Sequence, residues 1–123
     1  MKIRLYKDSV RLRLSPGEVE VLAKGEKVTE AFQWGDIVEL NFELIPDDSI
    51  TLNVTPNRST WQITWQKEKL LEWSESEEVG IYHDFANKGT KHIKVSIEKD
   101  FACVGREGED KKDRFPNPNA KAC

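Results

Sequence analysis

The chain has little cysteine and little methionine: two cysteines and one methionine stand among its 123 residues. A chain of this length buries enough apolar surface to fold as one domain, so neither a disulfide nor a structural metal is required for stability. We therefore expect a single domain over residues 1–123, in which a disulfide or a metal at the two cysteines is optional.

A long apolar run is also missing. No window approaches the roughly 18 apolar residues that a membrane-spanning helix requires, and Lys2, Arg4 and Lys7 interrupt the only candidate for an export signal. The net charge of -3 lacks the basic excess that is usual in nucleic-acid-binding domains. These absences predict a cytoplasmic protein with no membrane partner and no nucleic-acid partner.

Recognisable catalytic motifs are absent as well. The sequence contains no G-x-S-x-G, phosphate-binding loop, H-E-x-x-H or dinucleotide-binding fingerprint. With four Trp and five Phe, however, it is too aromatic for a disordered chain. We therefore expect a folded protein that is not an enzyme. A thiol-dependent enzyme or redox sensor is the weaker alternative, because it would need an activated Cys103.

Apolar and polar residues alternate through most of the chain. In residues 38–44 this alternation places the apolar side chains on one face of a strand and the polar ones on the other. Segments with the same pattern are 10–14, 50–54, 61–65 and 93–97, with shorter or less regular candidates at 3–5, 28–32 and 79–85. The turn residues between them favour hairpins. The predicted fold class is α+β, with a mainly antiparallel curved sheet, sandwich or partly closed barrel of about 7–8 strands and two short helices.

Two segments break the alternation and predict the helices. Ser15 and Glu18 fit a capping box, in which each side chain bonds the backbone N–H of the other residue, and Gly25 fits the end of that helix. Residues 66–76 carry apolar side chains three apart among charged ones, which is typical of a short amphipathic helix. No internal sequence repeat is evident.

Charge is distributed unevenly along the chain. Residues 1–14 hold five Lys or Arg against one acid, and residues 66–78 hold five Glu against two Lys. One interpretation is two solvated faces of opposite sign, and the other is a recognition patch. Both stay open at this stage.

The alternation ends at Asp100, and residues 100–123 form an irregular C-terminal segment. A stretch of this length without regular structure is usually either functional or disordered. Phe115 and the two prolines that follow it favour order, because an aromatic residue can anchor the segment and proline lowers the entropy lost on ordering. We expect the segment to pack on the sheet.

This segment also holds both cysteines, Cys103 and Cys123. The acidic residues between them that we select as candidate ligands are Glu109, Asp110 and Asp113. Thiolates and carboxylates together suit zinc or another divalent metal, and His83 or His92 could add an imidazole. The spacing is not diagnostic, because structural zinc sites normally present close cysteine pairs. A disulfide and two buried free thiols therefore remain alternatives.

The two ends of the sequence resemble the signature ends of a family of small, uncharacterised bacterial proteins. The opening M-K-I-R and R-L-R-L-S carry the resemblance at one end, and E-K-D-F-x-C, an acidic run, F-P-N-P and a final Cys carry it at the other. The C-terminal motif comprises Glu98, Lys99, Asp100, Phe101, Cys103, Phe115, Pro116, Asn117, Pro118 and Cys123. The resemblance implies that these elements form one unit, and it implies no activity or cofactor.

The sequence thus favours a small cytoplasmic binding protein of unknown ligand, either a small molecule or a protein, with its site in the C-terminal segment. The alternative is a structural or protein-interaction domain, such as a homodimer, whose C-terminal segment and cysteines only complete the core.

Overall fold

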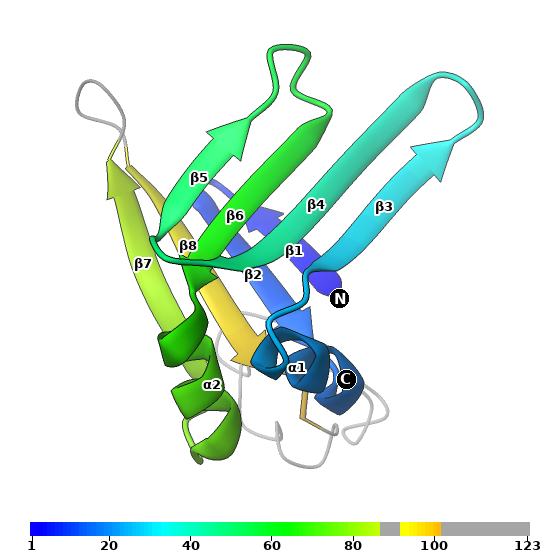
Figure 1. Cartoon of the computed structure of the whole chain (residues 1–123). Helices are drawn as coiled ribbons and strands as arrows, with labels where there is room; N and C mark the ends of the chain where they lie inside the picture. Colours follow the sequence, from blue (N-terminus) through cyan, green and yellow to red (C-terminus); the bar gives the residue numbers. More distant parts are fainter. Residues whose placement is uncertain (87–91, 102–123) are drawn as a thin grey trace, which may run out of the picture.

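The computed structural model describes residues 1–86 and 92–101, which form eight strands and two helices (Figure 1). In chain order the elements are β1 (Lys2–Tyr6), β2 (Ser9–Leu14), α1 (Pro16–Ala23), β3 (Val28–Trp34), β4 (Val38–Asp47), β5 (Thr51–Val54), β6 (Thr60–Gln66), α2 (Lys67–Glu75), β7 (Gly80–Ala86) and β8 (His92–Lys99). The predicted fold class, with its strand count and two short helices, is confirmed. Both helices begin where the alternation breaks.

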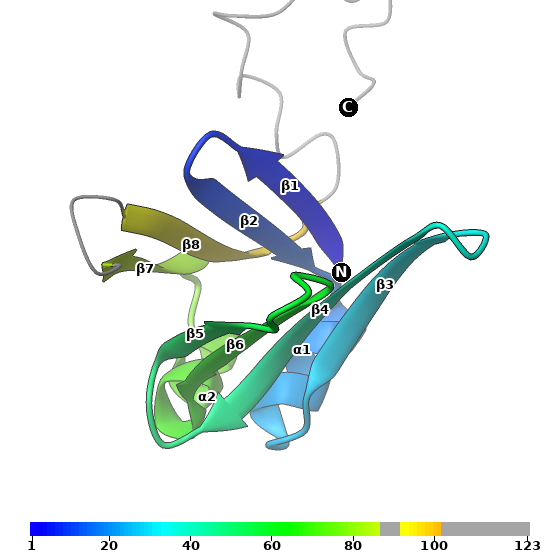
Figure 2. The same ribbon diagram turned by 90° about the horizontal axis from the view of Figure 1, so that it is seen from above.

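The strands form two four-stranded sheets rather than one curved sheet. Sheet A has the order β1-β2-β8-β7, and sheet B has the order β3-β4-β6-β5. The outer pairs of each sheet are antiparallel, but the central pairs β2–β8 and β4–β6 are parallel. Viewed from above, the sheets form two separate layers (Figure 2). The turns correctly predicted the hairpins β1–β2, β3–β4, β5–β6 and β7–β8, but a hairpin between β4 and β5 is wrong, because β4 pairs with β6. The turns carried no information about the parallel pairs, which join distant parts of the chain.

The same order of elements occurs twice along the chain. In the first half the hairpin β1–β2 leads through α1 to the hairpin β3–β4, and in the second half β5–β6 leads through α2 to β7–β8. Each sheet combines one hairpin from each half, as can be followed in Figure 1. The two halves are therefore related by an approximate two-fold arrangement, which no repeat in the sequence had indicated.

The core residues follow this arrangement. Val10, Leu12, Leu14, Val19 and Leu22 of the first half are buried, and so are Ile63, Trp65, Leu70 and Trp73 at the same spacing in the second. Alternation places these strand residues between the two sheets. The helices α1 and α2 pack against each other and close one end of the layers (Figure 1).

The start of α1 is capped as the sequence predicted. The Glu18 backbone N–H donates to Ser15 Oγ at 3.3 Å, and the Ser15 backbone N–H donates to Glu18 Oε1 at 2.9 Å. The Glu18 carboxylate also accepts a hydrogen bond from the Met1 amino group, which bonds Glu30 at 3.0 Å as well. These contacts connect the start of β1 to both α1 and β3.

Candidate functional site

Four basic side chains share the outer face of the β1–β2 hairpin in sheet A. Ile3 lies opposite the buried Leu12, so these two side chains face the core. The residues that alternate with them point to the other face. Lys2 and Arg4 on β1, with Arg11 and Arg13 on β2, therefore form an array that we call the cation face.

The cation face places like charges directly opposite each other. Lys2 pairs with Arg13 across the two strands, and Arg4 pairs with Arg11. Directly opposed residues on one face of an antiparallel pair have Cβ atoms about 4.5–5.5 Å apart, and like charges at that separation lower stability. The fold therefore places two like-charged pairs side by side.

The other half of the molecule shows that the fold does not need these charges. At the equivalent positions of the β5–β6 hairpin, Thr51 lies opposite Thr64 and Asn53 lies opposite Gln62. The two threonine hydroxyls are hydrogen bonded, and Asn53 Nδ2 donates to Gln62 Oε1 at 3.5 Å. Neutral side chains thus satisfy each other where the cation face has repulsion.

Arg11 is held in place by a buried carboxylate. Its Nε donates to Glu98 Oε1, and Glu98 on β8 is only 8 % exposed. The Tyr82 hydroxyl donates to the second oxygen, Glu98 Oε2, at 3.1 Å. Because both carboxylate oxygens and Nε are engaged, the terminal nitrogens of Arg11 remain the donors through which it can bind a ligand.

Gly80 makes the contact between Tyr82 and Glu98 possible. A Cβ at this position would lie 2.8 Å from the Tyr82 hydroxyl oxygen, 2.8 Å from Glu98 Cγ and 2.9 Å from the Ile97 carbonyl oxygen. The Tyr82 ring therefore passes over a residue without a side chain. Burial raises the pKa of the Tyr82 phenol, and the negative charge of Glu98 raises it further, so the phenol stays protonated as a donor.

A second carboxylate forms an ion pair with the cation face at Lys2. Lys2 Nζ lies 2.9 Å from Asp100 Oδ2, and the Asp100 backbone N–H donates to the Leu14 carbonyl at 2.8 Å. The strand pairing also places Arg13 beside Glu98. Within residues 1–86 and 92–101, the Arg4 side chain makes no hydrogen bond or ion pair, which distinguishes it from the other three cations.

These contacts bring the two ends of the sequence together. The M-K-I-R and R-L-R-L segments lie on β1 and β2, and the start of the E-K-D-F segment continues β8 beside β2. The uneven charge of residues 1–14 was the sequence signal for this face. Nothing in the sequence indicated Tyr82 or Gly80, because their role depends on which strand lies beside β8.

The residues predicted from the C-terminal motif are only partly described. Glu98 and Asp100 join the cation face, whereas Lys99 points to the opposite face and donates to the Ser76 carbonyl at 2.6 Å. Phe101 is 47 % exposed. The remaining predicted site residues, Cys103, Glu109, Asp110, Asp113, Phe115, Pro116, Asn117, Pro118 and Cys123, lie outside the described residues.

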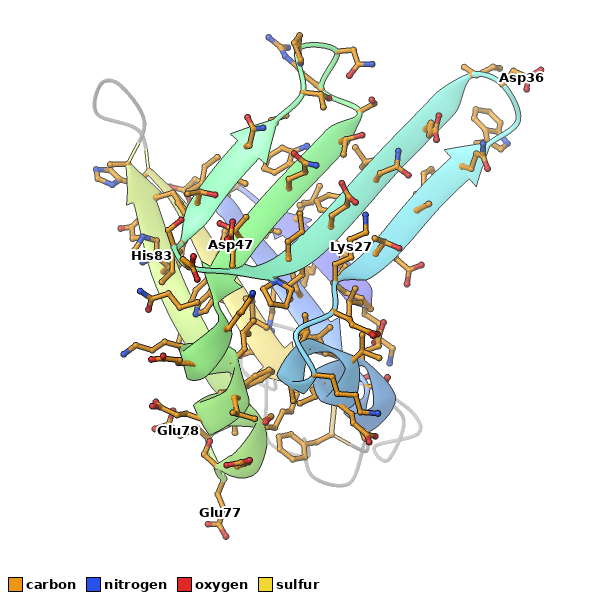
Figure 3. The ribbon with its side chains drawn as sticks, in the orientation of Figure 1. Lys27, Asp36, Asp47, Glu77, Glu78 and His83 are labelled. Atoms are coloured by element: carbon orange, nitrogen blue, oxygen red, sulfur yellow. The ribbon has the colours of Figure 1, made fainter. Side chains whose placement is uncertain are left out.

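The two histidines that were considered as metal ligands point to opposite faces of sheet A. His83 on β7 (Figure 3) lies opposite the buried Val95, and its ring contacts Phe85 at 4.5 Å and Trp65 at 6.0 Å between centroids. His92 is on the outer face, 3.7 Å from Asp84. In the described part of the chain, no group of three or more His, Cys, Asp or Glu side chains could hold a metal.

The chain belongs to DUF7009, a family of unknown function whose sequence model matches residues 1–119. No curated protein and no solved structure matches the chain. Among the described helices, none is long and apolar enough to cross a membrane.

Proposed function

We propose that the chain, as a member of this family, is a non-enzymatic binding protein whose cation face recognises a ligand with two or more oxyanion groups. The observation that carries the proposal is the pair of like-charged cross-strand contacts, Lys2 with Arg13 and Arg4 with Arg11. A bound anion would turn this repulsion into attraction.

The chemistry of the four side chains fits oxyanions. Guanidinium groups donate two parallel hydrogen bonds to a carboxylate or phosphate, which a lysine ammonium cannot do. Residues two apart on a strand lie about 6.5 Å from each other, and opposed residues lie about 5 Å apart. An array of these dimensions can contact two neighbouring phosphate or carboxylate groups at once, which favours a multivalent ligand over a single anion.

The Glu98 contacts favour binding rather than simple solvation of the charges. A solvated arginine needs no fixed orientation, but Arg11 is only 30 % exposed and is held through Nε by a carboxylate that Tyr82 also holds. Preorganising a donor in this way lowers the entropy lost when a ligand binds. Arg4, directly opposite, supplies a second donor that makes no hydrogen bond or ion pair within the described residues.

The C-terminal segment remains part of the proposal. It follows Asp100, which is bonded to Lys2 on the cation face, and its candidate ligands are Cys103, Glu109, Asp110, Asp113 and Cys123. A divalent metal held by these residues is a separate proposal, and it is supported by the donor types in the sequence alone.

A second candidate function follows from the Lys2–Asp100 ion pair. Because carboxylates of this chain already pair with Lys2 and Arg11, the acids of the C-terminal segment could complete the neutralisation of the face at Arg4, and the protein would then be a structural or interaction domain. Under this alternative, the cation face would bind no external anion.

An anion titration separates the two candidates. Full-length, reduced protein labelled with 15N is titrated at low salt with inorganic pyrophosphate and, separately, with tetraglutamate. The proposal predicts saturable shifts at the amides of β1, β2 and the end of β8, and none on the outer face of sheet B. Absence of saturable shifts with both probes, or equal shifts on the two sheets, would overturn it.

A further inference from the structure

An apolar groove opens between the two sheets on the side of β1 and β3. Its volume is about 320 Å³, and it is lined by Met1, Ile3, Leu5, Glu30, Ala31, Phe32, Leu40 and Phe42. This volume lies within the range of small-ligand pockets, about 300–1,000 Å³. Leu5 is 55 % exposed and Phe32 is 63 % exposed, so the groove leaves large apolar side chains in contact with water.

The equivalent apolar side chains of the other half are less exposed than Leu5 and Phe32. At the equivalent positions, Val54, Phe85 and Ile93 are only partly exposed. The hairpin β3–β4 extends beyond the sandwich instead, with Asp36 at its tip (Figure 3). The high exposure of Leu5 and Phe32 is therefore a departure from the two-fold arrangement and not a requirement of the fold.

We propose that this groove is the docking site of the C-terminal segment of the same chain, with Phe115 and Pro116 as the residues that fill it. Phe115 is the one aromatic residue of the sequence 102–123. Burying a phenylalanine side chain is among the larger apolar gains that a short segment can supply. The proposal concerns the inner side of β1 and is independent of anion binding on its outer face.

The place where the described chain ends supports this occupant. The Asp100 carboxylate bonds Lys2, and Lys2 lies between Met1 and Ile3, both of which line the groove. The 14 residue-to-residue steps from Phe101 to Phe115 can span up to about 46 Å when extended, whereas β1 itself covers only about 17 Å. The segment can therefore pass the edge of β1 and reach any part of the groove.

Composition supports the same assignment. Pro116 and Pro118 lower the conformational entropy that the segment loses when it docks. An unoccupied apolar groove would expose a surface of the kind that promotes association between molecules. Docking of the C-terminal segment of the same chain would cover this surface.

The test uses the full-length protein and two variants in the same segment. Phe115→Asp removes the aromatic ring and adds a charge, and Asn117→Asp adds the same charge without removing a ring. Nuclear Overhauser effects are measured between the Phe115 ring and the methyl groups of Ile3, Leu5 and Leu40, together with the fluorescence of an apolar dye.

Contacts from Phe115 to these methyl groups are expected in the parent and in Asn117→Asp. In Phe115→Asp the fraction of molecules whose groove is unoccupied should rise about tenfold or more, and the fluorescence of the apolar dye should rise with it. The proposal is overturned if the Phe115 ring shows contacts only elsewhere or none. It is also overturned if mixed labelled samples show contacts between two copies at the groove, which would make a second chain the occupant.

Discussion

Arg4 and Arg11 lie directly opposite each other on neighbouring strands, with both side chains on the outer face of sheet A. Their equivalents in sheet B, Asn53 and Gln62, are joined by a hydrogen bond. The equivalent cross-strand pair is thus hydrogen bonded in sheet B and like-charged in sheet A. Like charges that the fold does not require are what a binding surface is expected to carry.

Neutralising Arg4 should stabilise the free protein. In Arg4→Gln the free energy of unfolding is expected to rise by about 0.5 kcal/mol at low ionic strength, because a directly opposed like charge is removed. The gain should shrink at about 1 M salt, where screening acts within a few ångströms. Urea unfolding at the two salt concentrations measures both effects.

Lys24→Gln is the matched control for this prediction. Lys24 is an exposed residue beyond α1 whose only ion pair joins it to Glu20 at 3.6 Å, within the described residues, and such pairs contribute little. The free energy of unfolding of Lys24→Gln should therefore stay near that of the parent. If Arg4→Gln instead lowers stability, Arg4 makes a net favourable interaction in the free protein, and the assigned repulsion with Arg11 is contradicted.

A methyl group at Gly80 should damage the support of Arg11. Gly80→Ala places a Cβ within 2.9 Å of the Ile97 carbonyl oxygen, which is backbone and cannot easily move, and forces the Tyr82 ring away from Glu98. We expect a loss of about 1–3 kcal/mol. In Gly17→Ala, the control, the new Cβ meets nothing closer than 4.0 Å, so stability should hold or increase. Equal effects of the two variants on thermal unfolding would contradict this account.

The Tyr82 phenol should make stability depend on pH in the alkaline range. Its pKa is raised by burial and by Glu98, so its contribution is present below the unfolded value of about 10 and is lost as pH rises through the folded pKa. Tyr82→Phe should be less stable than the parent at neutral pH, by about 1 kcal/mol, because a hydrogen bond is missing. The difference should then shrink as pH rises from about 10 through the raised folded pKa. A constant difference in urea unfolding from neutral to alkaline pH would show that the hydroxyl is not the cause.

The metal proposal for the C-terminal segment has a direct test in native mass spectrometry of reduced protein purified without chelator. It predicts one bound divalent ion and protection of Cys103 and Cys123 from alkylation. The ion and the protection should both be lost when chelator is added to Asp113→Asn. Protected thiols without an ion indicate burial, and a mass lower by two hydrogens indicates a disulfide. Rapid alkylation of both thiols with no ion present would refute the metal site.

The sequence predicted the local structure well because alternation and capping are local signals. Residues 38–44 form part of a strand, and Ser15 caps a helix, for reasons contained within a few neighbouring positions. The parallel pairing of β2 with β8 could not be predicted in this way, since it joins Arg11 to a glutamate at the other end of the chain.

The candidate site was therefore found only in part. The excess of basic residues near the start of the chain was visible, but the like-charged pairs emerge only from the register between β1 and β2. Tyr82 carried no sequence signal, because a tyrosine in a strand becomes a partner of Glu98 only where β7 lies beside β8. The two-fold arrangement was hidden since equivalent core positions differ in side chain, as with Val10 and Trp61.

The affinity of pyrophosphate for the parent, Arg4→Gln and Lys24→Gln, measured by calorimetry at low salt, tests the central claim most directly. The account predicts saturable binding by the parent, an affinity within about twofold in Lys24→Gln, and a loss of about tenfold in Arg4→Gln, since a hydrogen bond to a charged group contributes about 1.4 kcal/mol. No saturable binding by the parent, or equal losses in the two variants, would contradict the assignment of the cation face as an anion-binding site.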